Sequence, residues 1–276
     1  MKSSTRPELI VHIGTHKTGT TSIQTLMAAR RRALKKAGIV HVPVPKKAKA
    51  IMLDYDMNDY GSLEKSVRPS RGKRYVMVWE GFCGNVNHGY ANAGYAAKNL
   101  RLFTSAFDVK IVLFIRPVKS FLASLYAQSV ALGDMRTPDR FYRSVHFNFE
   151  KLEGIYRKEF DDVRVLHYTD NTVASFSDVI RFDLESSYKS VRKNQSYKGA
   201  LLEFARKFNE HATPEEIAQF RRLAQSISWT GREDEATILA RIAASSFSAD
   251  EHRRLKKLGA WLGIRTTIAR RVAWQG

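Results

Sequence analysis

Short, predominantly apolar runs recur along the chain and predict the strands of a buried parallel sheet. They cover residues 9–13, 75–79, 109–115 and 163–166, and a further run at 39–44 is interrupted by proline. Runs of this length that lack polar alternation are typical of strands covered on both faces. The first run leads directly into a glycine-bearing loop, so a strand, a loop and then a helix are expected there.

Apolar residues at helical spacing follow two of these runs. The first set ends before Gly38, which suits the C-terminal end of a helix, and it comprises Ile23, Leu26, Met27, Ala33 and Leu34. The second begins after Pro117, which suits a first helical turn, and its expected apolar face comprises Val118, Phe121, Leu122, Leu125 and Leu132. Strands that alternate with helices indicate a three-layer α/β fold, of the P-loop type, with a mainly parallel central sheet.

The C-terminal part of the chain is expected to be helical from Ser196 onward. Thr213 to Glu216 and Ser248 to Glu251 both match the capping box that begins a helix. We therefore predict a single domain, with an α/β core over residues 1–190 and a helical extension or lid over residues 191–276.

The loop after the first run, Ile13-Gly-Thr-His-Lys-Thr-Gly-Thr-Thr-Ser22, has the glycine spacing of a phosphate-binding loop. In nucleoside-triphosphate loops the second glycine is followed by Lys and then by Ser or Thr. Here Gly19 is followed by Thr20 and Thr21, and Lys17 lies two residues before that glycine. The loop therefore predicts an anion site at a helix N-terminus, for a phosphate-bearing ligand other than an ordinary triphosphate. A strand-to-helix turn that binds no ligand is the alternative.

Charge is distributed unevenly along the chain. The 46 Lys and Arg residues exceed the 27 Asp and Glu residues, which gives a net charge of +19, and no acidic residue lies between Glu8 and Asp54. This positive region is expected to attract anionic ligands to the loop. Arg30 to Lys36 are equally compatible with the solvated face of a helix, and the polar segment from Lys46 to Lys73 is expected to pack over or beside the site.

Cysteine content and the lengths of the apolar runs bear on the compartment. Cys83 is the only cysteine, so no disulfide can form within the chain and an oxidising compartment is not implied. No apolar run approaches the length of a membrane span or of a signal peptide. We therefore expect a cytoplasmic protein with an inert thiol, whose basic surface can rest against anionic lipid headgroups.

The strongest strand, at 109–115, ends in Arg116. A magnesium-dependent triphosphate enzyme would normally carry an aspartate on a strand neighbouring the loop to hold the metal. The arginine instead offers a planar fork suited to phosphate or sulfate, and Ser124 follows about two helical turns further on. Arg116 and Ser124 are therefore candidates for holding a second phosphate group, with a structural salt bridge as the alternative for Arg116.

Together the two motifs resemble those of sulfotransferases that use 3′-phosphoadenosine-5′-phosphosulfate. The stretch from Ile13 to Thr21 looks like their 5′-phosphosulfate-binding loop, and Arg116-Pro-Val-Lys-Ser-Phe-Leu-Ala-Ser124 looks like their 3′-phosphate-binding motif. The resemblance covers the first strand-loop-helix and residues 109–130 strongly, and the rest only loosely. It implies transfer of a sulfuryl group to a hydroxyl or amine, with 3′,5′-adenosine diphosphate as product and no metal required.

Carried over residue by residue, the resemblance assigns a role to each motif. Lys17 would contact the transferring sulfuryl group and the leaving oxygen, and Arg116 with Ser124 would hold the 3′-phosphate. The loop residues around the 5′-phosphate would be Gly14, Thr15, Thr18, Gly19, Thr20 and Thr21. Sulfuryl transfer, by analogy with phosphoryl transfer, develops charge on its oxygens, so positioned cations and N–H donors stabilise its transition state.

The acceptor must also lose a proton, so a general base is expected near the sulfuryl group. Glu80 is the first candidate because it follows the strand at 75–79, and His16 in the loop is the second. Among the sulfotransferases that this chain resembles, the base is a glutamate in several carbohydrate and protein sulfotransferases and a histidine in the small-molecule cytosolic group. An ion pair is the structural alternative for Glu80, and His12 is expected to be a core histidine.

Residues 191–199 form a basic, polar turn before a helix and look like the late loop that closes over the nucleotide in this family. The contacts it would supply are Arg192, Asn194, Ser196 and Lys198. A plain helix start capped by Ser196 explains the same residues.

Three functions compete at this point. A sulfotransferase acting on a carbohydrate or glycolipid, such as a surface polysaccharide precursor, accounts for Lys17, Arg116 and Ser124. A P-loop kinase or nucleoside triphosphatase is suggested by the spacing of Gly14 and Gly19. A non-catalytic polyanion-binding protein is suggested by the net charge, and it predicts binding that weakens steeply with salt. No specific nucleic acid partner is expected.

Overall fold

The computed structural model describes residues 6–44, 70, 72–185 and 197–227, together with residues 229, 231, 232, 234, 237, 238 and 241. The chain divides into two compact units. The first comprises residues 1–121 and 145–193, and the second comprises residues 122–144 and 194–276. The candidate loop lies in the first unit.

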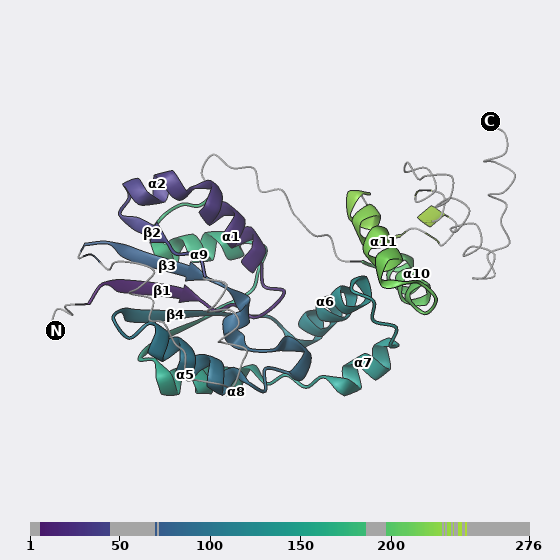
Figure 1. Ribbon diagram of the computed structural model, residues 1–276, viewed down its shortest axis with the longest axis horizontal. Coiled ribbons are helices and arrows are strands. Elements are labelled where there is room, and N and C mark those ends of the chain that lie inside the picture. Colours follow the sequence, from purple (N-terminus) through teal and green to yellow (C-terminus); the bar gives the residue numbers. More distant parts are fainter. Residues whose placement is uncertain are drawn as a thin grey trace, which may run out of the picture. The chain divides into compact units, whose positions relative to one another are not determined.

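The first unit is built on a parallel sheet of five strands (Figure 1). The strands are β1 (Glu8–His12), β2 (Ile39–His41), β3 (Arg74–Val78), β4 (Asp108–Ile115) and β5 (Asp162–His167), in the order β2-β3-β1-β4-β5. In the centre, Val11 of β1 pairs with Met77 on one side and with Ile111 on the other. Each apolar run of the sequence therefore forms a strand, as predicted.

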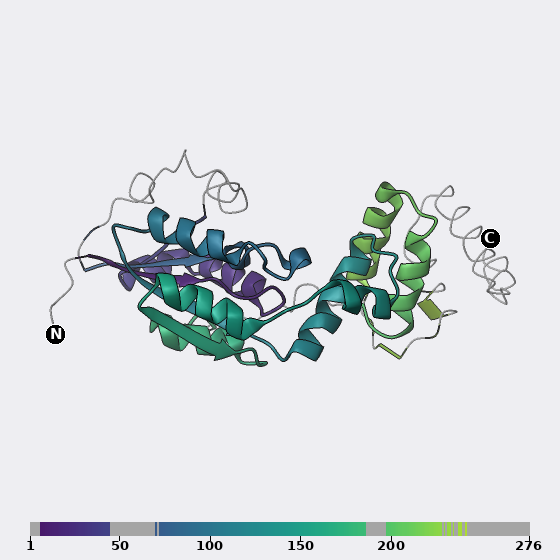
Figure 2. The same ribbon diagram turned by 90° about the horizontal axis from the view of Figure 1, so that it is seen from below.

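Helices cover both faces of this sheet (Figures 1 and 2). On one face lie α1 (Thr20–Ala29), α2 (Arg31–Lys36) and α9 (Thr172–Ile180), and on the other lie α5 (Ala93–Phe103) and α8 (Phe149–Glu159). The buried core beneath the first group joins alternate strand residues such as Ile10, Val76 and Phe114 to Ile23 and Phe176. This arrangement confirms the α/β class, because a parallel sheet needs apolar cover on both faces.

Two details of the helices differ from the sequence pattern. The helix expected after the loop is divided at Arg30, which separates α1 from α2. On α6 (Val118–Ala131), Val118 is 43% exposed, and Leu132 lies beyond the helix end and is 59% exposed. Tyr126 is buried instead, because its hydroxyl donates to the carbonyl of Arg136 at 2.9 Å and its ring can then leave water.

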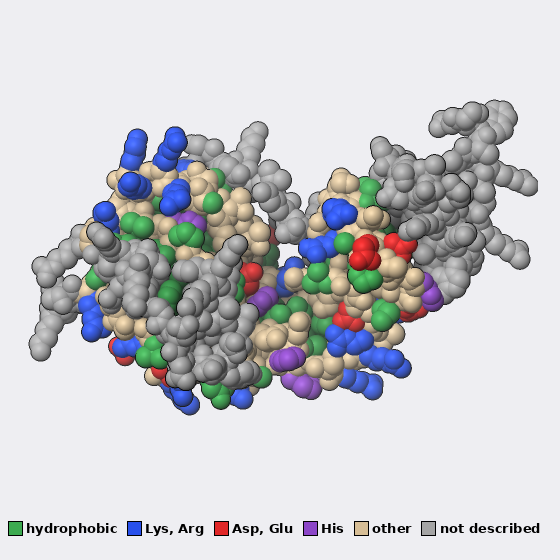
Figure 3. Space-filling model, in the orientation of Figure 1, with side chains coloured by type: hydrophobic (Ala, Val, Ile, Leu, Met, Phe, Trp, Pro, Cys, Tyr) green, Lys and Arg blue, Asp and Glu red, His purple; other side chains and the backbone are tan. Residues whose placement is uncertain are grey.

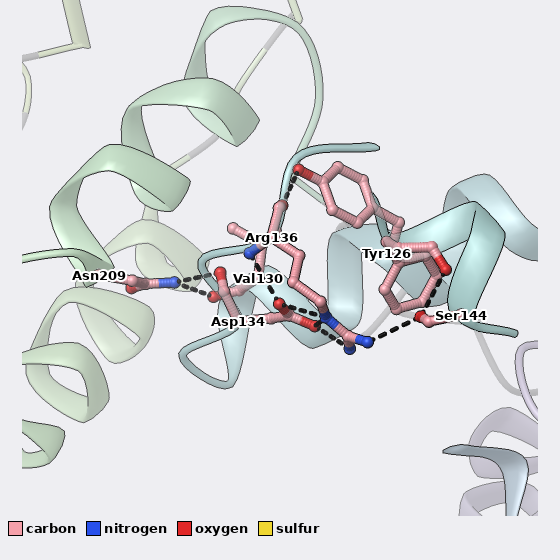
Figure 4. Close-up of polar contacts among 7 residues, drawn as sticks. Tyr126, Val130, Asp134, Arg136, Ser144 and Asn209 are labelled. Atoms are coloured by element: carbon pink, nitrogen blue, oxygen red, sulfur yellow. Dashed lines mark hydrogen bonds and ion pairs between the residues drawn. The ribbon is translucent and has the colours of Figure 1, made fainter. Parts of the chain in front are cut away.

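In the second unit, a polar network closes the turn between α6 and α7 (Pro138–Ser144), as Figure 4 shows. The guanidinium of Arg136 binds the carboxylate of Asp134 and donates to Ser144 Oγ at 2.8 Å. Asn209 Nδ2 donates to the carbonyls of Val130 at 2.7 Å and Asp134 at 3.1 Å. These bonds hold the turn against the end of α10 (Ala200–Asn209).

The expected C-terminal helices begin with α10 and α11 (Pro214–Ser226). Thr213 forms the predicted capping box, since its N–H donates to Glu216 Oε2 at 2.8 Å while its hydroxyl accepts from the Glu216 N–H. Phe208 and Phe220 pack between the two helices with ring centroids 4.9 Å apart. The second predicted capping box, at residues 248–251, lies outside the described residues.

Two short 3₁₀ helices, η1 (Glu80–Cys83) and η2 (Val86–His88), follow β3. The polar segment at 46–73, expected to cover the site, lies outside the described residues except for residues 70, 72 and 73.

Within the described part of the chain, no helix has both the length and the apolar character needed to cross a membrane.

Candidate functional site

The candidate loop, residues 13–19, leaves the carboxyl end of the central strand β1. From β1 the chain builds β2 and β3 on one side and then β4 and β5 on the other. The carboxyl end of β1 is therefore the point where the strand order reverses. In open parallel sheets such a point forms the crevice in which ligands bind.

Three residues of the loop adopt left-handed backbone conformations: Gly14 (φ +60°), Lys17 (φ +65°) and Gly19 (φ +83°). A side chain at Gly14 would also lie 2.9 Å from Thr20 Oγ1 and 3.2 Å from His12 Cε1, so only glycine fits. Lys17 has no such freedom, and a lysine held in this region stores backbone strain of the kind that gathers at functional sites.

The threonine hydroxyls of the loop divide into engaged and unsatisfied groups. Oγ1 of Thr15 and Oγ1 of Thr20 are buried without a hydrogen-bond partner among the described residues. Thr18 donates its hydroxyl to the carbonyl of Thr15, and Thr21 is exposed on the first turn of α1. A buried hydroxyl left unpaired costs about 1–3 kcal/mol. Thr15 and Thr20 therefore supply the loop with two hydroxyl donors that are not committed to other described residues.

The start of α1 adds backbone donors at the same place. Gly19 is the N-cap residue and supplies no side-chain cap. The first N–H groups of a helix have no partner inside the helix, and together with the helix dipole they favour an anion. The Thr20 hydroxyl lies in this first turn, so backbone and side-chain donors occur together.

Arg116 meets the loop directly. Its Nη1 donates to the carbonyl of Lys17 at 3.3 Å, its Nε donates to Ser120 Oγ at 2.9 Å, and its guanidinium lies 4.8 Å from the ring centroid of Tyr168. None of these partners is a carboxylate, so the contacts give the salt-bridge alternative no support. The hydroxyl beside Arg116 belongs to Ser120, while Ser124 lies one turn further along α6, in the second unit.

Glu80 lies at the carboxyl end of β3, next to β1, as the sequence predicts. The N–H of Trp79 donates to the carbonyl of His12 at 3.0 Å, which joins the ends of the two strands just before Glu80. Oε2 of Glu80 is buried without a hydrogen-bond partner among the described residues. A carboxylate oxygen can only accept hydrogen bonds, so this oxygen retains unused acceptor capacity.

Cys83 supports the loop from the same 3₁₀ helix. Its Sγ donates to the carbonyls of Gly14 at 2.7 Å and Ile13 at 3.3 Å. Burial, and to a smaller extent the negative charge of Glu80, raises the pKa of this thiol well above its usual value. Cys83 is therefore an unreactive structural thiol, in line with the sequence-based expectation.

The two histidines near the loop have different surroundings. His12 is fully buried between Phe114 and Phe176, each with its ring centroid 5.2 Å away, and burial lowers its pKa to about 3. It is a core histidine, as predicted. His16 contacts the hydroxyl of Tyr90 through its backbone N–H at 3.0 Å and through Nδ1 at 3.2 Å. Burial, aided by the positive charge of Lys17, lowers the pKa of His16 to about 4.

The cations of α2 lie away from the loop. Arg31, Arg32, Lys35 and Lys36 are exposed, and the surface formed by α2 carries a group of basic side chains (Figure 3). The ten residues of α1 separate them from the loop by about 15 Å. The carbonyl of Gly38, just after α2, accepts from the N–H of Arg74 at the start of β3. These cations therefore occupy the amino end of the sheet, which supports the solvated-face interpretation.

Of the late-loop residues, Arg192, Asn194 and Ser196 lie outside the described residues, and Lys198 is exposed in the second unit. Sequence reasoning missed three side chains at the site: Tyr90, Ser120 and Tyr168. Ser120 lies inside the arginine motif and Tyr168 comes two residues after a predicted strand, so both carried a positional signal. Tyr90 belongs to no motif.

Neither a scan against protein-family models nor a search of curated proteins finds a match to this chain. Among the described residues, no group of three or more His, Cys, Asp or Glu side chains is arranged to hold a metal ion.

Proposed function

We propose that this protein is a sulfotransferase with a P-loop-type fold. It transfers a sulfuryl group from 3′-phosphoadenosine-5′-phosphosulfate to a hydroxyl or amine, on a carbohydrate or glycolipid. The observation that carries the proposal is the contact of 3.3 Å between Arg116 Nη1 and the Lys17 carbonyl. It brings the motif that resembles a 3′-phosphate site to the motif that resembles a 5′-phosphosulfate site.

In this proposal the loop holds the sulfated 5′-phosphate. The orphan hydroxyls of Thr15 and Thr20 and the first N–H groups of α1 would donate to its oxygens. Lys17 would stabilise the negative charge that develops on the leaving oxygen as the bond between sulfur and that oxygen breaks. Arg116 would bind the 3′-phosphate, and Ser124 remains the sequence-based candidate for the second contact.

Glu80 would serve as the general base. Its buried Oε2 lacks a hydrogen-bond partner among the described residues and lies at the carboxyl end of the strand beside β1. It would accept the acceptor's proton while the acceptor oxygen or nitrogen bonds to sulfur. Positioned protein cations and N–H donors then stabilise the charge of the transition state.

The alternative is a P-loop kinase or nucleoside triphosphatase, which the spacing of Gly14 and Gly19 favours. The position of Lys17 before Gly19, rather than after it, argues against this function. The arginine at the end of β4 argues against it as well.

Transfer of radiolabelled sulfate from the donor to a panel of glycans, glycolipids and phenols tests the proposal. We expect labelling of a polyhydroxylated acceptor and none with Lys17→Ala, whose fold is checked by circular dichroism. Labelling that persists in Lys17→Ala, or no labelling of any class by the wild type, would count against it.

A further inference from the structure

Tyr90 is held in a defined position beside the loop. It is buried and has a left-handed backbone conformation (φ +63°). Its N–H donates to the carbonyl of Asn85 at 2.9 Å, and its ring meets Phe147 edge to face, with centroids 5.4 Å apart. A strained backbone persists only where its surroundings fix it, so the hydroxyl of Tyr90 is presented to His16 in one place.

The hydrogen bonds of that hydroxyl determine where the proton of His16 lies. The Tyr90 oxygen accepts from the His16 backbone N–H, so its own O–H needs a separate acceptor. Within the described residues, that acceptor is Nδ1 of His16, 3.2 Å away. If Nδ1 carried a proton, the buried Tyr90 O–H would face a second donor and remain unpaired, at a cost of about 1–3 kcal/mol. Nδ1 is therefore the unprotonated nitrogen and Nε2 carries the proton.

Nε2 of His16 is open to a ligand. It makes no hydrogen bond within the described part of the chain and is not among the buried orphan atoms there. His16 lies between Thr15, whose hydroxyl is orphaned, and Lys17. Its lowered pKa keeps the imidazole neutral at pH 7.

We propose that Tyr90 is a positioning residue that fixes His16 as the neutral Nε2–H tautomer, so that His16 donates a hydrogen bond to the bound anion and does not act as the general base. A nitrogen that already carries its proton cannot remove another, whereas an N–H suits a sulfuryl or phosphate oxygen. The hydrogen bond from His16 to the anion rests on the proposed function, whereas the assignment of the tautomer does not. Glu80 then remains the candidate base.

Nitrogen-15 NMR of the histidine side chains in the ligand-free protein tests the tautomer. In the wild type we expect the His16 proton on Nε2, with Nδ1 unprotonated. Tyr90→Phe removes the hydroxyl and should give a mixture of the two tautomers and faster exchange of the His16 amide proton. Tyr126→Phe removes a comparable hydroxyl in the second unit and should leave His16 unchanged. A wild-type proton on Nδ1, or an unchanged tautomer in Tyr90→Phe, would overturn the proposal.

Two substitutions of His16 test the donor role. The side-chain amide nitrogen of Gln can stand in for Nε2 and donate, but it cannot act as a base. We expect His16→Ala to reduce kcat/KM about tenfold to a hundredfold, as for the loss of a hydrogen bond to a charged group, and His16→Gln to recover most of it. Equal losses in the two variants would refute the donor role. If no acceptor is sulfated at all, the proposed function fails while the NMR result still decides the tautomer.

Discussion

Replacing Lys17 by glycine should separate the structural cost of this residue from its chemical role. Lys17 has φ +65°. The left-handed conformation costs a residue with a side chain about 1–2 kcal/mol. Glycine does not have this cost, but it loses about 0.5–1 kcal/mol more through chain entropy. Lys17→Gly should therefore change the free energy of unfolding by roughly 0 to +1.5 kcal/mol in favour of the folded state.

The same substitution should abolish sulfuryl transfer, because it removes the cation and keeps the loop backbone. The carbonyl of residue 17, which Arg116 contacts at 3.3 Å, is present in the variant as well. Loss of activity would then reflect the missing ammonium group rather than a displaced loop. Urea unfolding, with its midpoint and slope, measures the stability, and the radiolabelled transfer assay measures the activity.

Arg181→Gly is the matched control. Arg181 is exposed, has φ +52° and caps the C-terminus of α9, where glycine is commonly preferred. Arg74 Nη1 donates at 2.6 Å to the carbonyl of the neighbouring Ile180, which places this end of α9 at the start of β3, away from the loop. Arg181→Gly should give a similar gain in stability with full activity.

Two results would refute this reasoning. A loss of more than about 1 kcal/mol in Lys17→Gly alone would show that contacts of the lysine side chain hold the loop together. Wild-type transfer by Lys17→Gly would show that the lysine is not the catalytic cation.

Four further predictions concern the loop and its neighbours. Gly14→Ala should destabilise the protein by about 2 kcal/mol or more, and more than Gly19→Ala, because only the former meets a neighbouring atom at 2.9 Å; equal urea midpoints would contradict this. Glu80→Gln should lower turnover by roughly 10²- to 10⁴-fold with affinity for 3′,5′-adenosine diphosphate kept, and wild-type turnover would remove Glu80 from the mechanism. Arg116→Lys should weaken binding of that nucleotide about tenfold or more, since the planar fork is lost; unchanged affinity in a titration would exclude the role. Below about pH 6.5 the unfolded chain protonates His12, whereas the folded state does so only near pH 3. His12 therefore destabilises the fold as pH falls from 6.5 to 3, and His12→Leu should reduce this loss in urea unfolding measured across that range.

The sheet was predictable from the sequence because burial on both faces leaves mainly apolar runs, and each predicted run forms a strand. The ends of the helices were less predictable. Val118 and Leu132 fit the helical spacing but are exposed, since periodicity does not say which residues a neighbouring element reaches. Tyr126, with a polar tip, is buried because its hydroxyl finds the Arg136 carbonyl.

At the site, three residues carried by local motifs lie near the carboxyl ends of neighbouring strands. Lys17 and Glu80 follow neighbouring strands, and Arg116 comes within 3.3 Å of the loop. Partners distant in sequence gave no signal. Tyr90 reaches His16 across 74 residues, and such a contact depends on tertiary packing, which spacing along the chain does not encode. The hydroxyl beside Arg116 is that of Ser120, only four residues further on, so the motif itself offered this partner.

Calorimetric titration of the wild-type protein with 3′,5′-adenosine diphosphate and with magnesium ATP tests the central claim most directly. 3′,5′-Adenosine diphosphate offers a 3′-phosphate to Arg116, whereas ATP lacks that group and offers a 5′-triphosphate to the loop. We predict tighter binding of 3′,5′-adenosine diphosphate, with no requirement for magnesium. Tighter binding of magnesium ATP would contradict the proposed sulfotransferase and favour a kinase or nucleoside triphosphatase.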